Sequence, residues 1–160
     1  MRFAYDYGQL YVYDAGLGLL TDGNPYLDAL DAATGAGLTV GEASGVVDVL
    51  MPRQENFGAE IAVTIVGSEP PLDETADHVV EFDVTSSGRL KLEGSGGSGE
   101  LEVDVPAGRY RARLSGFDLD GAAAWSYGDP DYPPDHYRLE LWLSDSAERP
   151  AELRRWPGHV

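Results

Sequence analysis

Most of the chain alternates between apolar and polar residues with a period of two, and Gly, Pro or Ser interrupts each run after a few residues. For example, Val80, Phe82 and Val84 are separated by acidic residues. Such alternation places one set of side chains on the buried face of a strand and the other set in water. The same pattern predicts strands at 3–13, 38–40, 46–50, 60–66, 79–84, 89–93, 101–105, 110–114 and 137–143.

About seven to nine short strands with turn residues between them are typical of an all-β fold, either an antiparallel β-sandwich or a barrel. We expect the sandwich. Parallel sheets, buried on both faces, would give continuous apolar runs instead of alternation. The first segment, 3–13, is either one long strand or two strands joined by a bulge at Gly8.

One segment has the signals of a short helix. Asn24 is a favourable N-cap, and Pro25 suits the first helical position. Leu27 and Leu30 are three residues apart, so they lie on one face of a helix. We therefore expect a helix over 25–33 that covers an end or an edge of the sandwich.

The length of 160 residues fits one domain. We expect a single β-sandwich domain over 1–145. The segment 146–160 is polar, and we expect a C-terminal tail that contacts the surface through Leu153 and Trp156.

The composition excludes several classes of site. The chain has no cysteine, so disulfides, thiolate metal sites and a cysteine nucleophile are excluded. No apolar run has the length of a membrane helix. Asp6 interrupts the apolar start that a signal peptide needs, so a cytoplasmic location is the default expectation.

Charge is the strongest compositional signal. The chain has 28 Asp and Glu against 11 Lys and Arg, a formal net charge of −17. Such a surface repels nucleic-acid phosphates and anionic membranes, and it attracts basic proteins and cations. We therefore expect no nucleic-acid or membrane binding and a basic protein partner. The alternative is that the acidity serves solubility or a salty cytoplasm.

The segment Gly94–Gly99 formally matches the glycine pattern of dinucleotide-binding loops. That motif needs a helix after it, whose N-terminus meets the pyrophosphate. Here an alternating strand follows, so we interpret the segment as a flexible hairpin loop.

No motif indicates catalysis. His78, His136 and His159 lack the spacing of metal ligands, and no serine stands in a nucleophile motif. We therefore expect a protein that is not an enzyme and that has no cofactor and no bound metal.

The segment 117–135 is long for a connection in a compact domain, and such segments are functional or disordered. It combines carboxylates with aromatic residues, which together suit a basic partner. We predict that the partner-binding residues are Asp118, Asp120, Trp125, Tyr127, Asp129, Asp131, Tyr132 and Asp135.

Two other interpretations of this segment stay open. The sequence Asp118-Leu119-Asp120-Gly121 resembles part of a calcium-binding EF-hand loop, but the later Asp and the closing Glu are missing. Alternatively, the segment is a solvated loop whose aromatic residues pack back on the sandwich.

Near 105–110 the chain reads Val-Pro-Ala-Gly-Arg-Tyr, a turn that contains Pro106, Gly108 and Tyr110. This turn follows an aromatic first strand, a short helix and several alternating strands. From Arg2 to Ser115 this order resembles the competence protein J (ComJ) family, small inhibitors of a DNA-entry nuclease. The glycine-rich loop, the acidic segment and the final strand and tail depart from that pattern. The resemblance assigns no binding residue, and it implies inhibition by binding rather than catalysis.

The sequence thus favours an acidic binding protein that neutralises a basic partner, such as a nuclease or a nuclease toxin. A rigid acidic surface would occupy the basic cleft that normally holds phosphates. The alternatives are a ligand- or calcium-binding β-sandwich module and an enzyme of unrecognised type. The arrangement of carboxylates in space distinguishes the acidic binding protein from the calcium-binding module, because a metal site needs oxygens that converge on one point.

Overall fold

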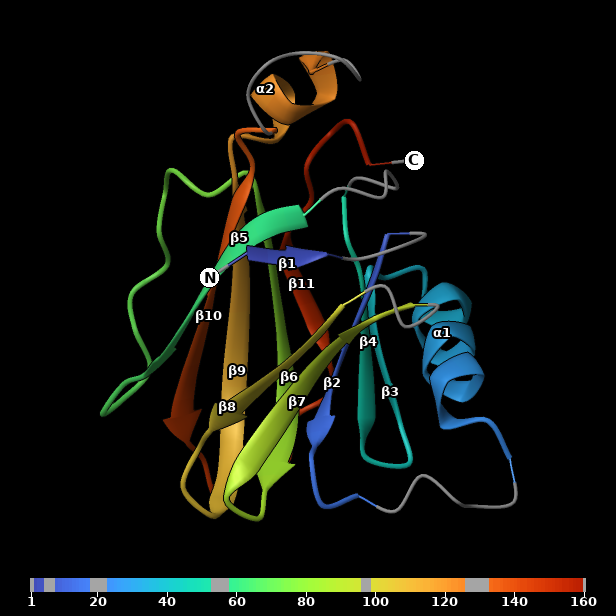
Figure 1. Cartoon of the computed structure of the whole chain (residues 1–160), viewed down its shortest axis with the longest axis vertical. Helices are drawn as coiled ribbons and strands as arrows, with labels where there is room; N and C mark the ends of the chain where they lie inside the picture. Colours follow the sequence, from blue (N-terminus) through green and yellow to red (C-terminus); the bar gives the residue numbers. More distant parts are fainter. Residues whose placement is uncertain are drawn as a thin grey trace.

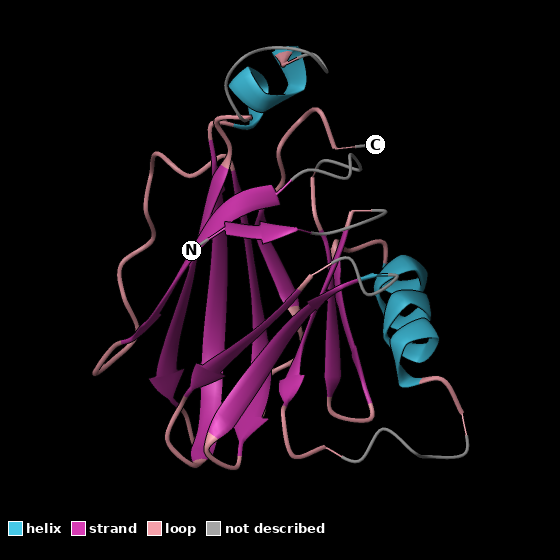
Figure 2. Cartoon of the chain, in the orientation of Figure 1, coloured by secondary structure: helices cyan, strands magenta, loops and turns pink. Residues whose placement is uncertain are grey.

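The computed structural model describes residues 2–4, 8–17, 23–52, 58–95, 99–125 and 133–159. These residues are mostly strand, arranged in two sheets with a helix beside one of them (Figures 1 and 2). The described strands do not close into a barrel, because each sheet ends in two different edge strands. The expected β-rich fold is confirmed, although with six and five strands the sheets contain more strands than the alternation predicts.

The six-stranded sheet has the order β1-β5-β10-β9-β6-β11. Its strands are β1 (Arg2–Ala4), β5 (Gly58–Ile65), β10 (His136–Leu143), β9 (Gly108–Phe117), β6 (His78–Ser86) and β11 (Ala151–Arg154). Neighbours run antiparallel except β5 and β10, which pair in parallel from His136–Glu60 to Leu141–Ile65. The prediction of purely antiparallel pairing is therefore wrong at this one ladder.

The five-stranded sheet has the order β3-β4-β2-β7-β8, and all its pairs are antiparallel. Its strands are β3 (Val40–Ala43), β4 (Val46–Leu50), β2 (Gln9–Asp14), β7 (Arg89–Gly94) and β8 (Glu100–Asp104).

The predicted first strand is in fact two strands in different sheets. β1 pairs with β5, whereas β2 lies between β4 and β7. The chain crosses from one sheet to the other between Ala4 and Gln9, and Gly8 has a left-handed φ of 64°. A sheet crossing and a bulge both leave the alternation almost intact, so the pattern alone did not separate them.

One buried apolar cluster takes side chains from both sheets. It includes Leu10 and Val12 of β2, Leu92 of β7, Phe82 of β6 and Leu139 of β10. Face-to-face packing of the two sheets as a sandwich stays a prediction, and this shared cluster supports it.

Helix α1 (Pro25–Ala36) begins as expected, and the side chain of Asn24 accepts a hydrogen bond from the backbone N–H of Leu27. It runs three residues further than predicted. Its buried face is formed by Pro25, Ala29 and Ala33, whereas Leu27 is 55% exposed. The helix therefore packs on the domain through its alanines and not through the face that carries Leu27.

The reason is a close approach between α1 and β3. A Cβ atom at Gly41 of β3 would lie 2.2 Å from the carbonyl oxygen of Ala29. Only glycine in the strand and small residues in the helix allow this packing, so Leu27 lies outward and Leu30 is only half-buried.

The outer face of β6 and β9 carries a buried ionic network instead of the water-facing polar set that the alternation predicts. Arg111 donates to Asp83 at 3.0 Å, and Arg113 donates to Glu81 at 2.7 Å. The arginine side chains are only 5% and 3% exposed, because segments around Pro70 and 148–149 cover them and accept further hydrogen bonds.

The segment after 146 contains a strand. β11 pairs with β6 at Val79–Glu81, and Trp156 is buried, whereas Leu153 is exposed. His78 holds the end of this segment, because its Nδ1 accepts from the backbone N–H of Trp156 at 3.3 Å.

His78 also joins a hydrogen-bonded chain. With Nδ1 accepting, Nε2 carries the proton and donates to Oγ1 of Thr39 at 3.0 Å, and Thr39 donates to Glu152 at 2.7 Å. The ring is 2% exposed. Burial, assisted by the neighbouring His159, lowers the pKa of His78 to about 4.

We predict that His78 makes the protein less stable in mild acid. The pKa of His78 is lower in the folded than in the unfolded chain. The contribution of neutral His78 to the free energy of unfolding is therefore complete above about pH 6.5 and is lost as the pH falls towards 4. The loss is on the order of 3 kcal/mol. Urea unfolding followed by tryptophan fluorescence over this pH range measures it.

His78→Gln should flatten this part of the pH dependence, whereas His136→Gln, at an exposed position, should keep it. Equal slopes in the two variants would contradict the assignment to His78.

Candidate functional site

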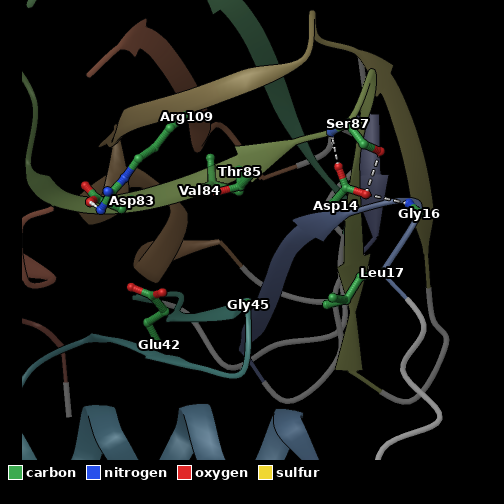
Figure 3. Close-up of a pocket in the computed structure, with 10 residues that line it drawn as sticks. All are labelled: Asp14, Gly16, Leu17, Glu42, Gly45, Asp83, Val84, Thr85, Ser87 and Arg109. Atoms are coloured by element: carbon green, nitrogen blue, oxygen red, sulfur yellow. Dashed lines mark hydrogen bonds and ion pairs between the residues drawn. The ribbon is translucent and has the colours of Figure 1, made fainter. Parts of the chain in front are cut away.

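A cavity of about 530 Å³ opens where the two sheets separate at one end. Four segments line it: the end of β2 with the turn after it, the β3–β4 hairpin, the end of β6 with its turn, and the start of β9. Figure 3 shows Glu42 and Leu17 across the cavity from the β6 residues Asp83 and Thr85.

The cavity exists because neighbouring strands end at different points. β11 pairs with β6 only as far as Glu81, so no described strand lies beside the rest of β6 on that side. β3 is the outermost strand of its own sheet, and its edge away from β4 also has no strand beside it within the described ranges. Two strand edges thus meet at this opening.

A second, smaller cavity of about 160 Å³ continues along β3. It lies between α1 and the segment Arg149–Pro150, and its walls include Ala32, Ala36 and Val40. Glu42 lines both cavities. We call the two together the edge groove.

Two of the three carboxylates in the larger cavity have partners within the fold. Asp14 accepts hydrogen bonds from the backbone N–H of Gly16 and from both the backbone and the hydroxyl of Ser87. These contacts fix the β6–β7 turn, and all the donors are neutral. Asp83 accepts from Arg109 at 2.9 Å and from Arg111 at 3.0 Å.

Glu42 is different, because it has no hydrogen bond or ion pair with any described residue. Partial desolvation by the cavity walls raises the pKa of Glu42, and the negative charge of Asp83 adds to the effect. The positive charges of Arg109 and Arg111 oppose it in part. Among the residues that the structure describes, Arg109 is the only cationic one that lines the larger cavity, and it already pairs with Asp83. The larger cavity therefore keeps a net negative charge.

The predicted site at 117–135 is at the other end of β6. His78, where β6 begins, pairs with Gly116 of β9 beside this segment, whereas Ser86, where β6 ends, lies near the groove. Contrary to the prediction of a continuous loop, Leu119–Ala124 forms a short helix, α2 (Figure 1).

The structure gives two of the predicted partner-binding residues a role within the fold. Asp120 accepts a hydrogen bond from the indole N–H of Trp156 at 2.7 Å. Asp135 is buried and accepts one from the hydroxyl of Tyr137 at 3.2 Å. Both contacts attach this segment to the rest of the domain.

The other six predicted residues divide into two groups. Asp118 is exposed at the start of α2, with its carboxylate 3.7 Å from His136, and Trp125 follows the last residue of α2. Tyr127, Asp129, Asp131 and Tyr132 lie outside the described residues.

In the part of the chain that the structure describes, no three His, Asp or Glu side chains are placed to hold a metal ion. No helix in the described ranges is long and apolar enough to cross a membrane.

Sequence reasoning missed the residues of the groove. Asp83 and Glu42 are polar positions next to apolar ones in short strands, like many others in the chain. Asp14 comes at the end of its strand. Their proximity depends on which strands are neighbours and where β11 ends, and no local motif encodes either.

We predict that Glu42→Gln stabilises the protein slightly at neutral pH. A raised pKa in the folded state means that ionised Glu42 opposes folding above that pKa, and glutamine removes the charge. The melting temperature should rise by about 1–3 °C near neutral pH, and the difference should vanish once Glu42 is protonated in acid.

Asp31→Asn is the matched control, because Asp31 is exposed on α1 and its substitution removes the same charge. Its melting temperature should stay close to that of the parent protein. A destabilised Glu42→Gln variant at neutral pH would show that Glu42 has a favourable partner in the fold.

No family model matches the chain, and no curated protein matches it. Two solved structures are similar to it. One is ComJ from Bacillus subtilis, described as the inhibitor of the DNA degrading activity of NucA, with 16% identity, a TM-score of 0.59 and coverage of 90% of this chain and 94% of ComJ. The other is described as Crocagin biosynthetic gene J, with 18% identity, a TM-score of 0.56 and coverage of 90% and 95%. The resemblance to ComJ is thus confirmed as a shared fold.

Proposed function

We propose that this protein is a non-catalytic inhibitor that binds a nuclease through acidic surfaces. The likeness to ComJ over 90% of the chain carries the proposal, because ComJ inhibits the DNA degrading activity of NucA. The match includes nearly the whole of both chains, so it concerns the architecture of the domain and not one motif.

The distribution of charge supports this function. Eight cationic side chains form ion pairs within the fold: Arg89, Lys91, Arg109, Arg111, Arg113, Arg138, Arg154 and Arg155. With a net charge of −17, the unpaired excess is negative. Such a surface attracts a basic protein over a distance of about a Debye length.

Inhibition would follow from competition with DNA. A nuclease holds phosphates with Lys and Arg side chains, and a folded acidic surface placed over them excludes the substrate. The buried network of Arg111 and Arg113 makes the central strands rigid, so little ordering entropy is lost on binding.

We propose that the segment 117–135 is one contact region. Trp125 would supply the apolar contact, and Asp118, Asp129 and Asp131 would steer the approach. Asp120 and Asp135 would contribute less, because both have partners within the fold.

The test of this function starts from a capture experiment. The immobilised protein should retain a nuclease from a lysate of its source cells, and the purified nuclease should lose its DNA degradation when this protein is added in equimolar amount. Added salt should weaken the inhibition, because it screens the attraction.

Polyglutamate of similar charge is the control, since it has the acidity without the fold. If polyglutamate inhibits equally well, or if no retained protein degrades DNA, the proposed function is wrong.

We predict that two changes in the segment 117–135 affect different rate constants. Trp125→Ala should speed dissociation about tenfold or more, because buried aromatic contacts carry most of the binding energy. The double variant Asp129→Asn and Asp131→Asn should mainly slow association, and more so at low salt. Surface plasmon resonance with the captured nuclease measures both rates.

The double variant Asp28→Asn and Asp31→Asn removes the same charge from α1 and should slow association less. If binding is unchanged after deletion of 126–132, the segment is not a contact region.

A further inference from the structure

The free edge of β3 is the least protected strand edge of the five-stranded sheet. At the opposite edge, β8 carries Glu102 and Asp104, which pair with Arg89 of β7, and Glu100, which pairs with Lys91. Charged side chains of this kind keep other strands away from an edge. β3 reads Val-Gly-Glu-Ala, and Glu42 is its only charged residue.

The edge groove runs along this strand edge. On one side of the groove lie Val40, Gly41 and Glu42, and on the other side lie Arg149–Pro150 followed by Asp83 and its neighbours. An edge with room beside it and with free backbone N–H and C=O groups is the structural requirement for strand addition.

The two cavities of the groove differ in chemistry. The smaller one has mainly apolar walls, formed by Ala32, Ala36, Leu38 and Val40, with Glu42 and Arg149 as its charged residues. The larger one has the carboxylates of Asp14, Glu42 and Asp83 and a single guanidinium that is already paired. A strand bound along the groove would therefore meet a mainly apolar environment at one end and an acidic environment at the other.

Glu42, which lines both cavities, is an exposed carboxylate that has no hydrogen bond or ion pair with any residue in the described ranges. A cation beside Glu42 would offset the repulsion from Asp83. It would also compensate Glu42 for the hydration that it loses through partial desolvation. No described cationic side chain pairs with Glu42. Its side chain is exposed, so a cation of another molecule can reach it.

We propose that the edge groove binds an extended basic segment of a protein partner. The segment adds as a strand to the free edge of β3, places a Lys or Arg side chain beside Glu42, and places a small apolar side chain in the cavity next to α1. Its identity as part of the inhibited nuclease rests on the proposed function. Backbone hydrogen bonds provide affinity, and the two cavities select the side chains.

The experiment uses a short synthetic peptide in which lysine alternates with valine and threonine, and a control peptide with glutamate in place of lysine. Titration of the labelled protein by NMR should shift the amide signals of Val40–Ala43 and of Val84–Ser86 with the lysine peptide. Hydrogen exchange of the β3 amides should become slower, because a new strand protects them. The glutamate peptide should have no effect.

Two variants test the acidic part of the groove. Glu42→Gln should weaken binding of the lysine peptide about fivefold, as expected for a partly exposed ion pair. Asp31→Asn, which removes the same charge from the exposed face of α1, should leave the affinity unchanged.

Thr85→Lys places a cation in the larger cavity and should abolish binding of the lysine peptide. Thr64→Lys makes the same change at an exposed position of β5 and is its control. Glu42→Gln keeps the test decisive if Thr85→Lys does not fold.

The inference fails if the lysine peptide leaves the β3 amides unprotected, or if Glu42→Gln binds it as tightly as Asp31→Asn does. That failure leaves the proposed function intact when the protein still inhibits its captured nuclease. Protection of β3 together with no inhibition of any nuclease has the opposite meaning: the groove binds basic segments, and the proposed function is wrong.

Discussion

The pairing of β6 with β9 and the ionic network on its outer face constrain the rest of the molecule. Arg111 lies between Glu81 and Asp83, and nearly all of its surface is removed from water. Breaking such a buried pair costs about 3–5 kcal/mol, because the remaining charge is left without a partner. The network also needs the carbonyl groups of Glu148 and Arg149. It therefore determines where the chain crosses the sheet before β11 and where the free edge of β6 begins.

The alternation of apolar and polar residues predicted several strands well. It failed for features that depend on contacts between distant parts of the chain. The expected strands 60–66, 79–84 and 137–143 correspond to β5, β6 and β10, because strict period-two patterns report one buried face. The face of α1 was wrong, since Gly41 lets the helix approach closely on its alanines. β11 was missed because it has only four residues, Ala-Glu-Leu-Arg, inside a polar segment, and its leucine is exposed. The edge groove was missed because it depends on strand order, which no local pattern contains.

Most cations of the described residues neutralise carboxylates inside the fold, so the charges left without a partner in the described fold are mainly carboxylates. The three carboxylates of the larger cavity show the difference between paired and unpaired acids. Asp83 is held by two arginines, Asp14 by neutral donors, and Glu42 by none of the described residues. A residue that fits its own fold poorly but suits a partner is a common sign of function, because binding sites trade stability for activity.

The parallel ladder between β5 and β10 has a consequence for synthesis of the protein. β10 begins more than seventy residues after β5 ends, and the strands that flank it in the finished sheet, β5 and β9, are made before it. On the ribosome, β5 therefore waits without its parallel partner while β6, β7, β8 and β9 are translated. Such long-range pairing slows folding and leaves strand edges exposed in the nascent chain. The completed six-stranded sheet can form only after β11 has left the exit tunnel, so chaperone protection of the growing chain matters more for this architecture than for a simple β-meander.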